Sequence, residues 1–260
     1  MNILITGGNG YVAKSLYNGL KNSHIISTIT RNDFDLTNYE LLKNYFLNNE
    51  RFDVVIHTAI SGGSRLSSDS FSTVDSNLQM YYNLLQNRNH YGRLISFGSG
   101  AEIHAKDTLY GLSKSIISDS IKTKDGFYNL RIYAVFDENE LDTRFIKSNI
   151  KRYIKKESMV VHQNKKMDFF YMQDLIKLVS YYIEEPSPPK QIDCKYETEY
   201  TLVDIANVIN DLSENKVDCV IGNTISSEDY IGSHTQLPIE YIGLKQGILN
   251  TYNIIKKELT

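Results

Sequence analysis

The feature that most constrains the fold of this chain is an abrupt change from apolar residues to glycine near its start. The run Ile3-Leu4-Ile5 is followed at once by Thr6-Gly7-Gly8-Asn9-Gly10-Tyr11-Val12-Ala13. A short buried strand that turns through glycines into a helix is typical of a dinucleotide-binding turn. Gly7 would allow the tight turn and Gly10 the close approach of a pyrophosphate, because neither carries a Cβ. The helix that begins near Tyr11 would point its free N–H groups and its positive dipole end at that anion.

Hydrophobic periodicity predicts strands and helices that alternate along the first half of the chain. Strands are expected at 3–5, 25–30, 53–58, 93–97 and 128–135, and helices at 11–21, 41–47, 73–87 and 109–122. The strand at 25–30 is β-branched and apolar and is expected to be buried. The alternation predicts an α/β fold, a Rossmann-like doubly wound parallel sheet with helices on both faces, over residues 1–135.

The second part, residues 136–260, changes character without a flexible linker. Helices are expected at 145–156, 174–184, 201–212 and 244–257, with a short strand at 159–162. Asp174 lies near the start of its helix, where a carboxylate can cap free N–H groups. These elements predict a small C-terminal α/β lobe that binds substrate, some of whose segments can return to the main sheet.

Composition narrows the possible partners. The 260 residues are 41% hydrophobic and 23% charged, with a formal net charge of −3 and no basic stripe, so nucleic acid is not expected as a partner. No long apolar span or secretory leader is present, which predicts a cytoplasmic protein without a membrane partner. Cys194 and Cys219 are widely spaced and match no ligand pattern, so neither a disulfide framework nor a metal site is expected.

The residues that carry chemistry are a tyrosine and a lysine four positions apart. Tyr110 and Lys114 lie on one predicted helix, so both side chains project from the same face. An ammonium beside a phenol favours the phenolate and lowers a pKa that starts near ~10. Such a tyrosine can pass a proton to or from a carbonyl or alcohol oxygen. Ser99, at the end of the preceding strand, can supply a second hydrogen bond to that oxygen.

Further segments follow the same order over nearly the whole chain. They are His57-Thr58-Ala59, Asn77-Leu78, Phe97-Gly98-Ser99, Tyr110-Gly111-Leu112-Ser113-Lys114, Leu130-Arg131-Ile132-Tyr133, Asp168-Phe169-Phe170-Tyr171-Met172-Gln173-Asp174-Leu175 and Tyr200-Thr201-Leu202-Val203-Asp204-Ile205-Ala206. With the glycine turn, they resemble the extended short-chain dehydrogenase/reductase family of NAD(P)-dependent nucleotide-sugar epimerases, dehydratases and reductases.

The resemblance implies a role for each matching residue. Ser99 would donate a hydrogen bond to the substrate oxygen, Tyr110 would be the general acid/base, and Lys114 its electrostatic partner and a ribose ligand. The cofactor would contact Thr6, Gly7, Gly8, Asn9, Gly10, Tyr11, Val12, Arg31, Asp35, Leu36, Thr58, Ala59, Asn77, Tyr110, Lys114, Ala134 and Val135, with Asp35 and Leu36 flanking the adenine. The substrate would contact Ser99, Gly100 and Arg144, the last at the N-terminal end of the helix at 145–156.

The choice between NAD and NADP depends on the residues after the second strand. An acidic residue directly at that strand's end would accept hydrogen bonds from a free ribose 2′-hydroxyl. Here the segment is Thr30-Arg31-Asn32-Asp33, and Arg31 can neutralise a 2′-phosphate. The sequence therefore favours NADP(H) over NAD(H).

Three reactions of the family can be compared with the residues present. A 4,6-dehydratase usually carries an Asp-Glu pair after the serine or threonine, but here Gly100 and Ala101 follow Ser99, and Glu102 alone is a poor substitute. GDP-L-fucose synthase uses a cysteine near the serine and a later histidine, and Ala101 occupies the approximate cysteine position. Plain reduction of the keto group of a nucleotide-linked 4-keto-6-deoxy sugar remains, with Tyr110 as proton donor. An NAD-dependent 4-epimerase and a catalytically silent cofactor-binding protein stay open as alternatives.

Two further expectations concern the surroundings of the site. Ser99 and Tyr110 are only eleven positions apart, and the short loop between them implies a more open substrate site. In this family the helices at 73–87 and 109–122 often pair with their symmetry mates. A homodimer is therefore expected, with Tyr81, Tyr82 and Ile116 as candidates for its apolar surface, although these residues also suit the internal stripe that faces the sheet.

Overall fold

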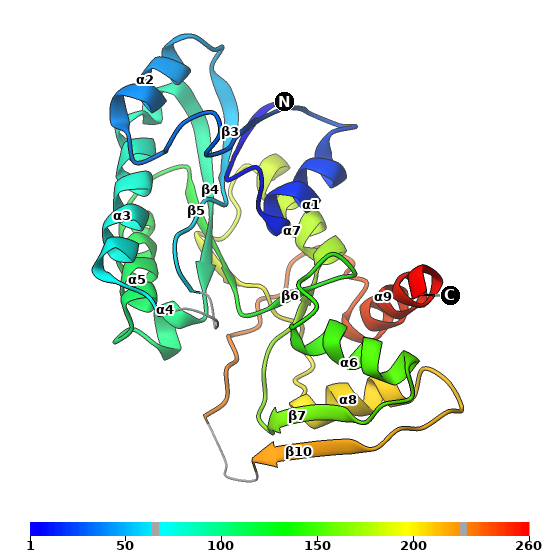
Figure 1. The fold of residues 1–260 in the computed structure, drawn as a ribbon. Coiled ribbons are helices and arrows are strands. Elements are labelled where there is room, and N and C mark those ends of the chain that lie inside the picture. Colours follow the sequence, from blue (N-terminus) through cyan, green and yellow to red (C-terminus); the bar gives the residue numbers. More distant parts are fainter. Residues whose placement is uncertain (64–67, 224–227, 260) are drawn as a thin grey trace. The chain divides into compact units, whose positions relative to one another are not determined.

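The computed structural model describes residues 1–63, 68–223 and 228–259, and the chain forms two compact units (Figure 1). The first unit combines Met1–Ile132 with Leu178–Ile192, and the second combines Tyr133–Lys177 with the chain from Asp193 onward. The second half of the chain thus returns one segment to the first unit. Among the described residues, no helix has the length and apolar character needed to cross a membrane.

The first unit is built on a six-stranded sheet with the strand order β2-β1-β3-β4-β5-β9. The strands are β1 (Asn2–Thr6), β2 (Ile25–Ile29), β3 (Phe52–His57), β4 (Tyr91–Ser99), β5 (Phe127–Ile132) and β9 (Gln191–Asp193). The strands from β2 to β5 in this order pair in parallel. The Rossmann-like parallel sheet predicted from the sequence is confirmed.

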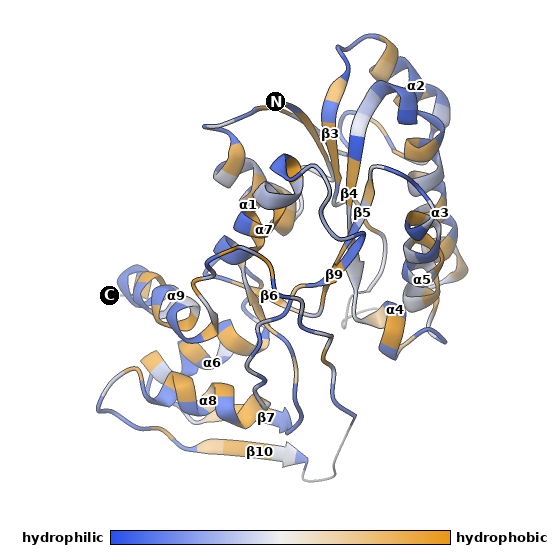
Figure 2. Ribbon diagram, turned by 180° about the vertical axis from the view of Figure 1, so that it is seen from behind, coloured by the Kyte–Doolittle hydropathy of each residue, from blue (hydrophilic) through white to orange (hydrophobic). Residues whose placement is uncertain are grey.

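Helices cover the sheet because its strands are apolar on both sides; β3 and β4 are buried along most of their length (Figure 2). The helices are α1 (Tyr11–Leu20), α2 (Tyr39–Leu47), α3 (Phe71–Gln86), α4 (Ala101–His104) and α5 (Leu109–Lys122), with a 3-10 turn at Arg88–His90. Sheet residues such as Leu4 and Leu94 share one core with Leu42 of α2, Leu84 of α3 and Ile117 of α5. These three helices therefore cover one face of the sheet.

Two predicted strands differ from the sequence expectation. Strand β2 is not fully buried: Ile25 is 74% exposed and only Ile29 is buried, because β2 lies at the edge of the sheet. The single strand predicted at 128–135 is two strands, because the chain leaves the sheet after Ile132. Its last part, β6 (Val135–Phe136), pairs with β8 (Phe170–Tyr171) in the second unit.

The second unit packs helices against two small sheets. Its elements are α6 (Phe145–Ile154), β7 (Met159–Gln163), α8 (Leu202–Asn210), β10 (Cys219–Asn223) and α9 (Leu244–Leu259), together with β6 and β8; α7 (Met172–Glu184) begins here and ends in the first unit. Strands β7 and β10 pair in parallel. Ile150, Val161, Ile205 and Ile248 are fully buried in one core. This core holds α6, α8 and α9 together with the two small sheets.

Candidate active site

The glycine turn has the tight geometry predicted from the sequence. Gly7 has a positive φ of 72°, which side chains rarely adopt, and a Cβ there would lie 2.8 Å from the backbone nitrogen of Ala59. The Gly10 N–H donates to the Gly7 carbonyl oxygen at 2.8 Å. The turn is therefore closed on itself, and the loop after β3 can lie directly against it.

Helix α1, which follows this turn, begins without an acidic residue of its own. Gly10 is the N-cap and makes no side-chain capping bond, and no acidic residue lies in the first turn. The first N–H groups of a helix need an acceptor, and an anion satisfies them while it interacts with the helix dipole. The glycine cradle and the open helix end together fit the pyrophosphate of a dinucleotide.

The ends of β1 and β3 are tied together beside this turn. Thr6 Oγ1 and His57 Nδ1 lie 2.8 Å apart, and the Thr58 hydroxyl donates to the Thr6 carbonyl oxygen at 2.6 Å. Burial lowers the pKa of His57 to about 3, so its imidazole is neutral. Strand β1 lies between β2 and β3 in the sheet, so later strands are added on both sides of it. Open α/β sheets bind ligands at such a switch point.

The predicted adenosine side of the site is a surface turn after β2. Arg31 is exposed, while the Asp33 carboxylate accepts hydrogen bonds from the backbone N–H and the hydroxyl of Thr30, both at 2.8 Å. The Asp35 carboxylate likewise accepts from the backbone and hydroxyl of Thr37. Both carboxylates therefore stabilise their own turns, and Arg31 precedes both of them in sequence.

Two predicted cofactor residues are engaged inside the protein. Leu36 is buried in the core, and its carbonyl oxygen accepts from Asn83 Nδ2. Asn77 is buried and clamps the loop after β3 to α5, because its amide bonds both the N–H and the carbonyl of Ser61 and donates to the Ser113 hydroxyl. Their contacts with a cofactor remain predictions.

The proposed acid/base pair lies on α5, as the four-residue spacing predicts. Thr108 caps the helix by accepting from the Gly111 N–H. Lys114 Nζ lies 5.9 Å from the centre of the Tyr110 ring and donates to the Phe97 carbonyl oxygen at 2.6 Å. Phe97 is two residues before Ser99 on β4. The lysine is thus fixed between the tyrosine and the strand that carries the serine.

Burial determines the electrostatics of this pair. Lys114 is 9% exposed, and desolvation lowers its pKa to about 8, while the nearby Glu102 carboxylate acts in the opposite direction. Ser99 Oγ accepts a hydrogen bond from the Ala101 N–H at 3.2 Å. An ammonium that titrates near neutral pH can change the charge felt by the Tyr110 phenol.

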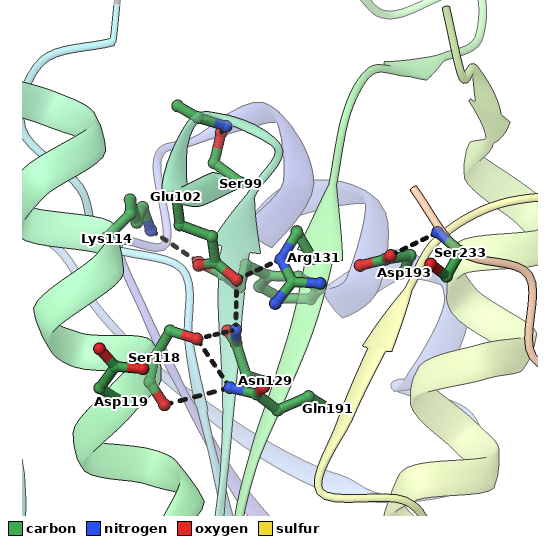
Figure 3. Close-up of polar contacts among 12 residues, drawn as sticks. Ser99, Glu102, Lys114, Ser118, Asp119, Asn129, Arg131, Gln191, Asp193 and Ser233 are labelled. Carbon is green, nitrogen blue, oxygen red and sulfur yellow. Dashed lines mark hydrogen bonds and ion pairs between the residues drawn. The ribbon is translucent and has the colours of Figure 1, made fainter. Parts of the chain in front are cut away.

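From the sequence, Glu102 was compared only with the acidic residues of a dehydratase. No role was expected for Asn129 and Arg131, its two partners on β5. Glu102 is 3% exposed, forms an ion pair with Arg131 and accepts from Asn129 Nδ2 at 3.0 Å (Figure 3). Asn129 and Arg131 alternate along β5 and so share one face of the sheet. Two polar residues on one face of a core strand are the signal that could have predicted a buried acidic partner.

The short loop between Ser99 and Tyr110 is not extended. It forms α4 and a turn that packs closely on α5: a Cβ at Gly111 would lie 1.9 Å from the Ala105 carbonyl oxygen. His104, at the end of α4, and His162 on β7 are both exposed. Residues 100–108 therefore direct Glu102 inward rather than forming an open edge.

Three predicted site residues, Ala134, Val135 and Arg144, lie in the second unit. Gly100 lies in the first unit, where its N–H donates to the Ile132 carbonyl oxygen. The Ala134 carbonyl oxygen accepts from the backbone of β8, and Val135 lies in β6. Arg144 is the exposed N-cap of α6. The carboxylate of Glu140 already accepts from the Lys147 N–H in the first turn of that helix, at 3.2 Å.

The candidate dimer residues differ in exposure. Tyr81 is 1% exposed and donates to the Ser120 hydroxyl, so its place in an intermolecular surface was wrongly predicted: it belongs to the internal core. Tyr82 and Ile116 are 48% and 38% exposed.

Comparisons with known proteins show which family the chain resembles. The model of the NAD dependent epimerase/dehydratase family matches residues 3–194. CDP-abequose synthase from Yersinia pseudotuberculosis is 23% identical over 244 residues, which cover 84% of this chain and 86% of that protein. UDP-glucose 4-epimerase from Thermotoga maritima has a similar structure, with a TM-score of 0.79, 14% identity and 100% of both chains covered. A GDP-6-OMe-4-keto-L-xylo-heptose reductase from C. jejuni gives a TM-score of 0.75 at 16% identity, covering 99% of this chain and 98% of that one.

The chain belongs to the NAD dependent epimerase/dehydratase family, because the family model matches well over half of its length. The family predicted from the sequence motifs is confirmed. The chain is accordingly an NAD(P)-dependent enzyme of this family.

Proposed function

We propose that this protein is an NADPH-dependent reductase that acts on the keto group of a nucleotide-linked 4-keto-6-deoxy sugar. The observation that carries the proposal is the position of Lys114, which is buried with its ammonium 5.9 Å from the Tyr110 ring centre. This arrangement suits a phenol that must release a proton during the reaction. The Tyr110–Lys114 pair comes after the glycine cradle in the sequence. The chain belongs to the epimerase/dehydratase family.

In the proposed reaction, bound NADPH supplies a hydride to the carbonyl carbon of the sugar. Ser99 donates a hydrogen bond to the carbonyl oxygen, and Tyr110 transfers its phenolic proton to that oxygen as negative charge develops there. Lys114 stabilises the phenolate that remains, because its positive charge lies close to the ring. Gly7, Gly10 and the N-terminus of α1 hold the pyrophosphate.

Two observations favour simple reduction over elimination of water. The Glu102 carboxylate, the acidic group nearest in sequence to Ser99, is buried against Arg131 and Asn129 and is therefore not available to a sugar. One structural relative is a reductase of a nucleotide-linked 4-keto sugar.

The preference for NADPH rests on Arg31. Its guanidinium is exposed after β2, where it can pair with a ribose 2′-phosphate, whereas Asp33 already accepts two hydrogen bonds from Thr30. Replacing Arg31 with alanine is expected to raise the KM for NADPH about tenfold, the value of one charge-assisted contact of ~1.4 kcal/mol, with little change for NADH. Unchanged preference would contradict this assignment.

We also infer that the protein is a homodimer that pairs through α3 and α5. Tyr82 and Ile116 on these helices are large, apolar and exposed. Light scattering at micromolar concentration tests this point, and a monomer mass would contradict it.

The experiment that tests the reaction is an NADPH-oxidation screen against GDP-, dTDP-, CDP- and UDP-linked 4-keto-6-deoxy sugars, with NMR identification of products. Net oxidation of NADPH with formation of the 4-hydroxy sugar is expected. Interconversion of 4-hydroxy sugars without net change of cofactor would instead identify a 4-epimerase.

A further inference from the structure

The Glu102 carboxylate is a buried charge that the proposed proton transfer does not use. Its Oε1 accepts from Arg131 Nε and, at 3.0 Å, from Asn129 Nδ2. Taking a carboxylate out of water is costly unless cations and hydrogen bonds compensate it. The groups that surround it indicate what its charge can do.

Gly98 on β4 leaves space for the Glu102 carboxylate. A Cβ at Gly98 would lie 2.9 Å from Glu102 Oε2 and 2.7 Å from the Asn129 amide, so any side chain there would displace both groups. Asn129 also donates to the Ser118 hydroxyl, which Gln191 bonds at 2.7 Å. Side chains from β5, α5 and β9 therefore fix the position of the carboxylate.

The same carboxylate faces the ammonium of Lys114 (Figure 3). Lys114 donates to the neutral Phe97 carbonyl, so Glu102 is the negative charge that acts on it. The other charged or titratable groups around it are the Arg131 cation from β5, the neutral His57 from β3 and Tyr110 on its own helix. Glu102 thus lies between the buried cation of Lys114 and the partly buried cation of Arg131.

We propose that Glu102 is a positioning residue for the Tyr110–Lys114 pair: its carboxylate, fixed by Arg131 and Asn129, keeps the Lys114 ammonium charged and directed between β4 and the Tyr110 ring. This inference rests on the proposed function, because it concerns the same proton transfer. Glu102 itself touches neither the sugar nor the cofactor in this account and acts only through Lys114.

The physical reason is that Lys114 titrates close to working pH. Burial lowers its pKa to about 8, and the Glu102 charge opposes that shift. Without the carboxylate, the buried Lys114 ammonium would lose the negative charge that raises its pKa. Lys114 would then release its proton at lower pH, and Tyr110 would lose the positive charge that stabilises its phenolate.

The test is the titration of Lys114 in the protein labelled with 15N-lysine, without cofactor or substrate, followed by NMR and assigned with K114R. The wild type is expected to titrate near pH 8. In E102Q the midpoint should fall by about one unit or more, a tenfold change in the ratio of charged to neutral lysine. E50Q removes an exposed charge from the same unit and should titrate as the wild type. An unchanged titration in E102Q would overturn the proposal.

A second variant and a second readout separate this role from simple support of the fold. E102D keeps the charge on a shorter side chain and should shift the pKa of Lys114 less than E102Q does. If E102Q does not fold, E102D replaces it in the test. A titration of Lys114 in E102D that equals that of the wild type would then overturn the proposal. Where turnover is observed, the loss of kcat at high pH should begin at lower pH in E102Q, and an unmoved profile contradicts the proposal. Absence of turnover in the wild type contradicts the proposed reductase, while the lysine titration still decides for or against Glu102.

Discussion

The start of α1 in the first unit differs from the starts of α6 and α9 in the second. In the first unit, α1 begins at Gly10 with no side-chain cap and no acidic residue in its first turn. In the second unit, Glu140 accepts from the first turn of α6, and the Asp174 carboxylate accepts from the Ile242 and Gly243 N–H groups just before α9. Acidic side chains thus accept hydrogen bonds at the starts of α6 and α9, whereas the first turn of α1 holds no acidic residue. Changes in the first unit should therefore impair function, and changes in the second should impair stability.

The largest effect is expected from removal of the Tyr110 hydroxyl. Y110F should lower kcat by about 10²- to 10⁴-fold, because proton transfer to the carbonyl oxygen loses its donor. The dissociation constant for NADPH, measured by fluorescence titration, should change little, and so should the midpoint of thermal unfolding. If Y110F keeps its turnover, Tyr110 is not the proton donor, and the assignment of function to the first unit is contradicted.

The next effect concerns Asp174 in the second unit. Its fully buried carboxylate accepts from the Tyr196 hydroxyl and from the Ile242 and Gly243 N–H groups. D174A should lower the free energy of unfolding by about 3 kcal/mol, because it leaves buried donors without an acceptor. Urea denaturation measures this loss. The matched control is D211A, which removes an exposed partner of Lys216 and should cost less than about 1 kcal/mol; equal losses would contradict the account.

A pair of glycines compares the two units directly. Both Gly7 and Gly243 have positive φ, but only Gly7 has backbone within reach of an added Cβ, whereas nothing lies within 4 Å at Gly243. G243A should cost about 1 kcal/mol from backbone strain alone. G7A should cost about 2 kcal/mol and also weaken NADPH binding. Normal binding by a folded G7A protein would show that the cradle is not needed for the dinucleotide.

A further effect is a pH dependence of stability in the second unit. Burial raises the pKa of Glu140 to about 8, well above its ordinary value, so the folded protein binds more protons there than the unfolded chain does. Stability contributed by this group is therefore present at low pH and lost as pH rises through about 8. Between pH 5 and 8, the free energy of unfolding of the wild type, measured by urea denaturation, should fall by at least about 1.4 kcal/mol more than that of E140Q. Parallel curves for the two proteins would contradict a protonated Glu140.

The sequence predicted the parallel sheet and most of the helices because their signals are local. Apolar runs, helical periodicity and glycines at the first turn each lie within a few residues of the element they define. The same reasoning placed Tyr110 and Lys114 on one face of α5, since a four-residue spacing in a helix determines that geometry.

What the sequence could not predict depends on contacts between distant residues. The inward direction of Glu102 depends on Asn129 and Arg131 on β5, which lie 27 and 29 positions away along the chain. The strand predicted at 128–135 is divided after Ile132, because its last residues pair with β8. Likewise, periodicity alone did not distinguish the buried Tyr81 from the exposed Tyr82.

The most direct test of the central claim is the fate of the hydride. NADPH labelled with deuterium at C4 of the nicotinamide, on the face that is transferred, is incubated with the accepted 4-keto sugar, and the product is analysed by mass spectrometry and NMR. The account predicts one deuterium on the new carbinol carbon for each NADPH consumed, and almost none with Y110F in the same time. An unlabelled product, or sugar interconversion without consumption of NADPH, would contradict it.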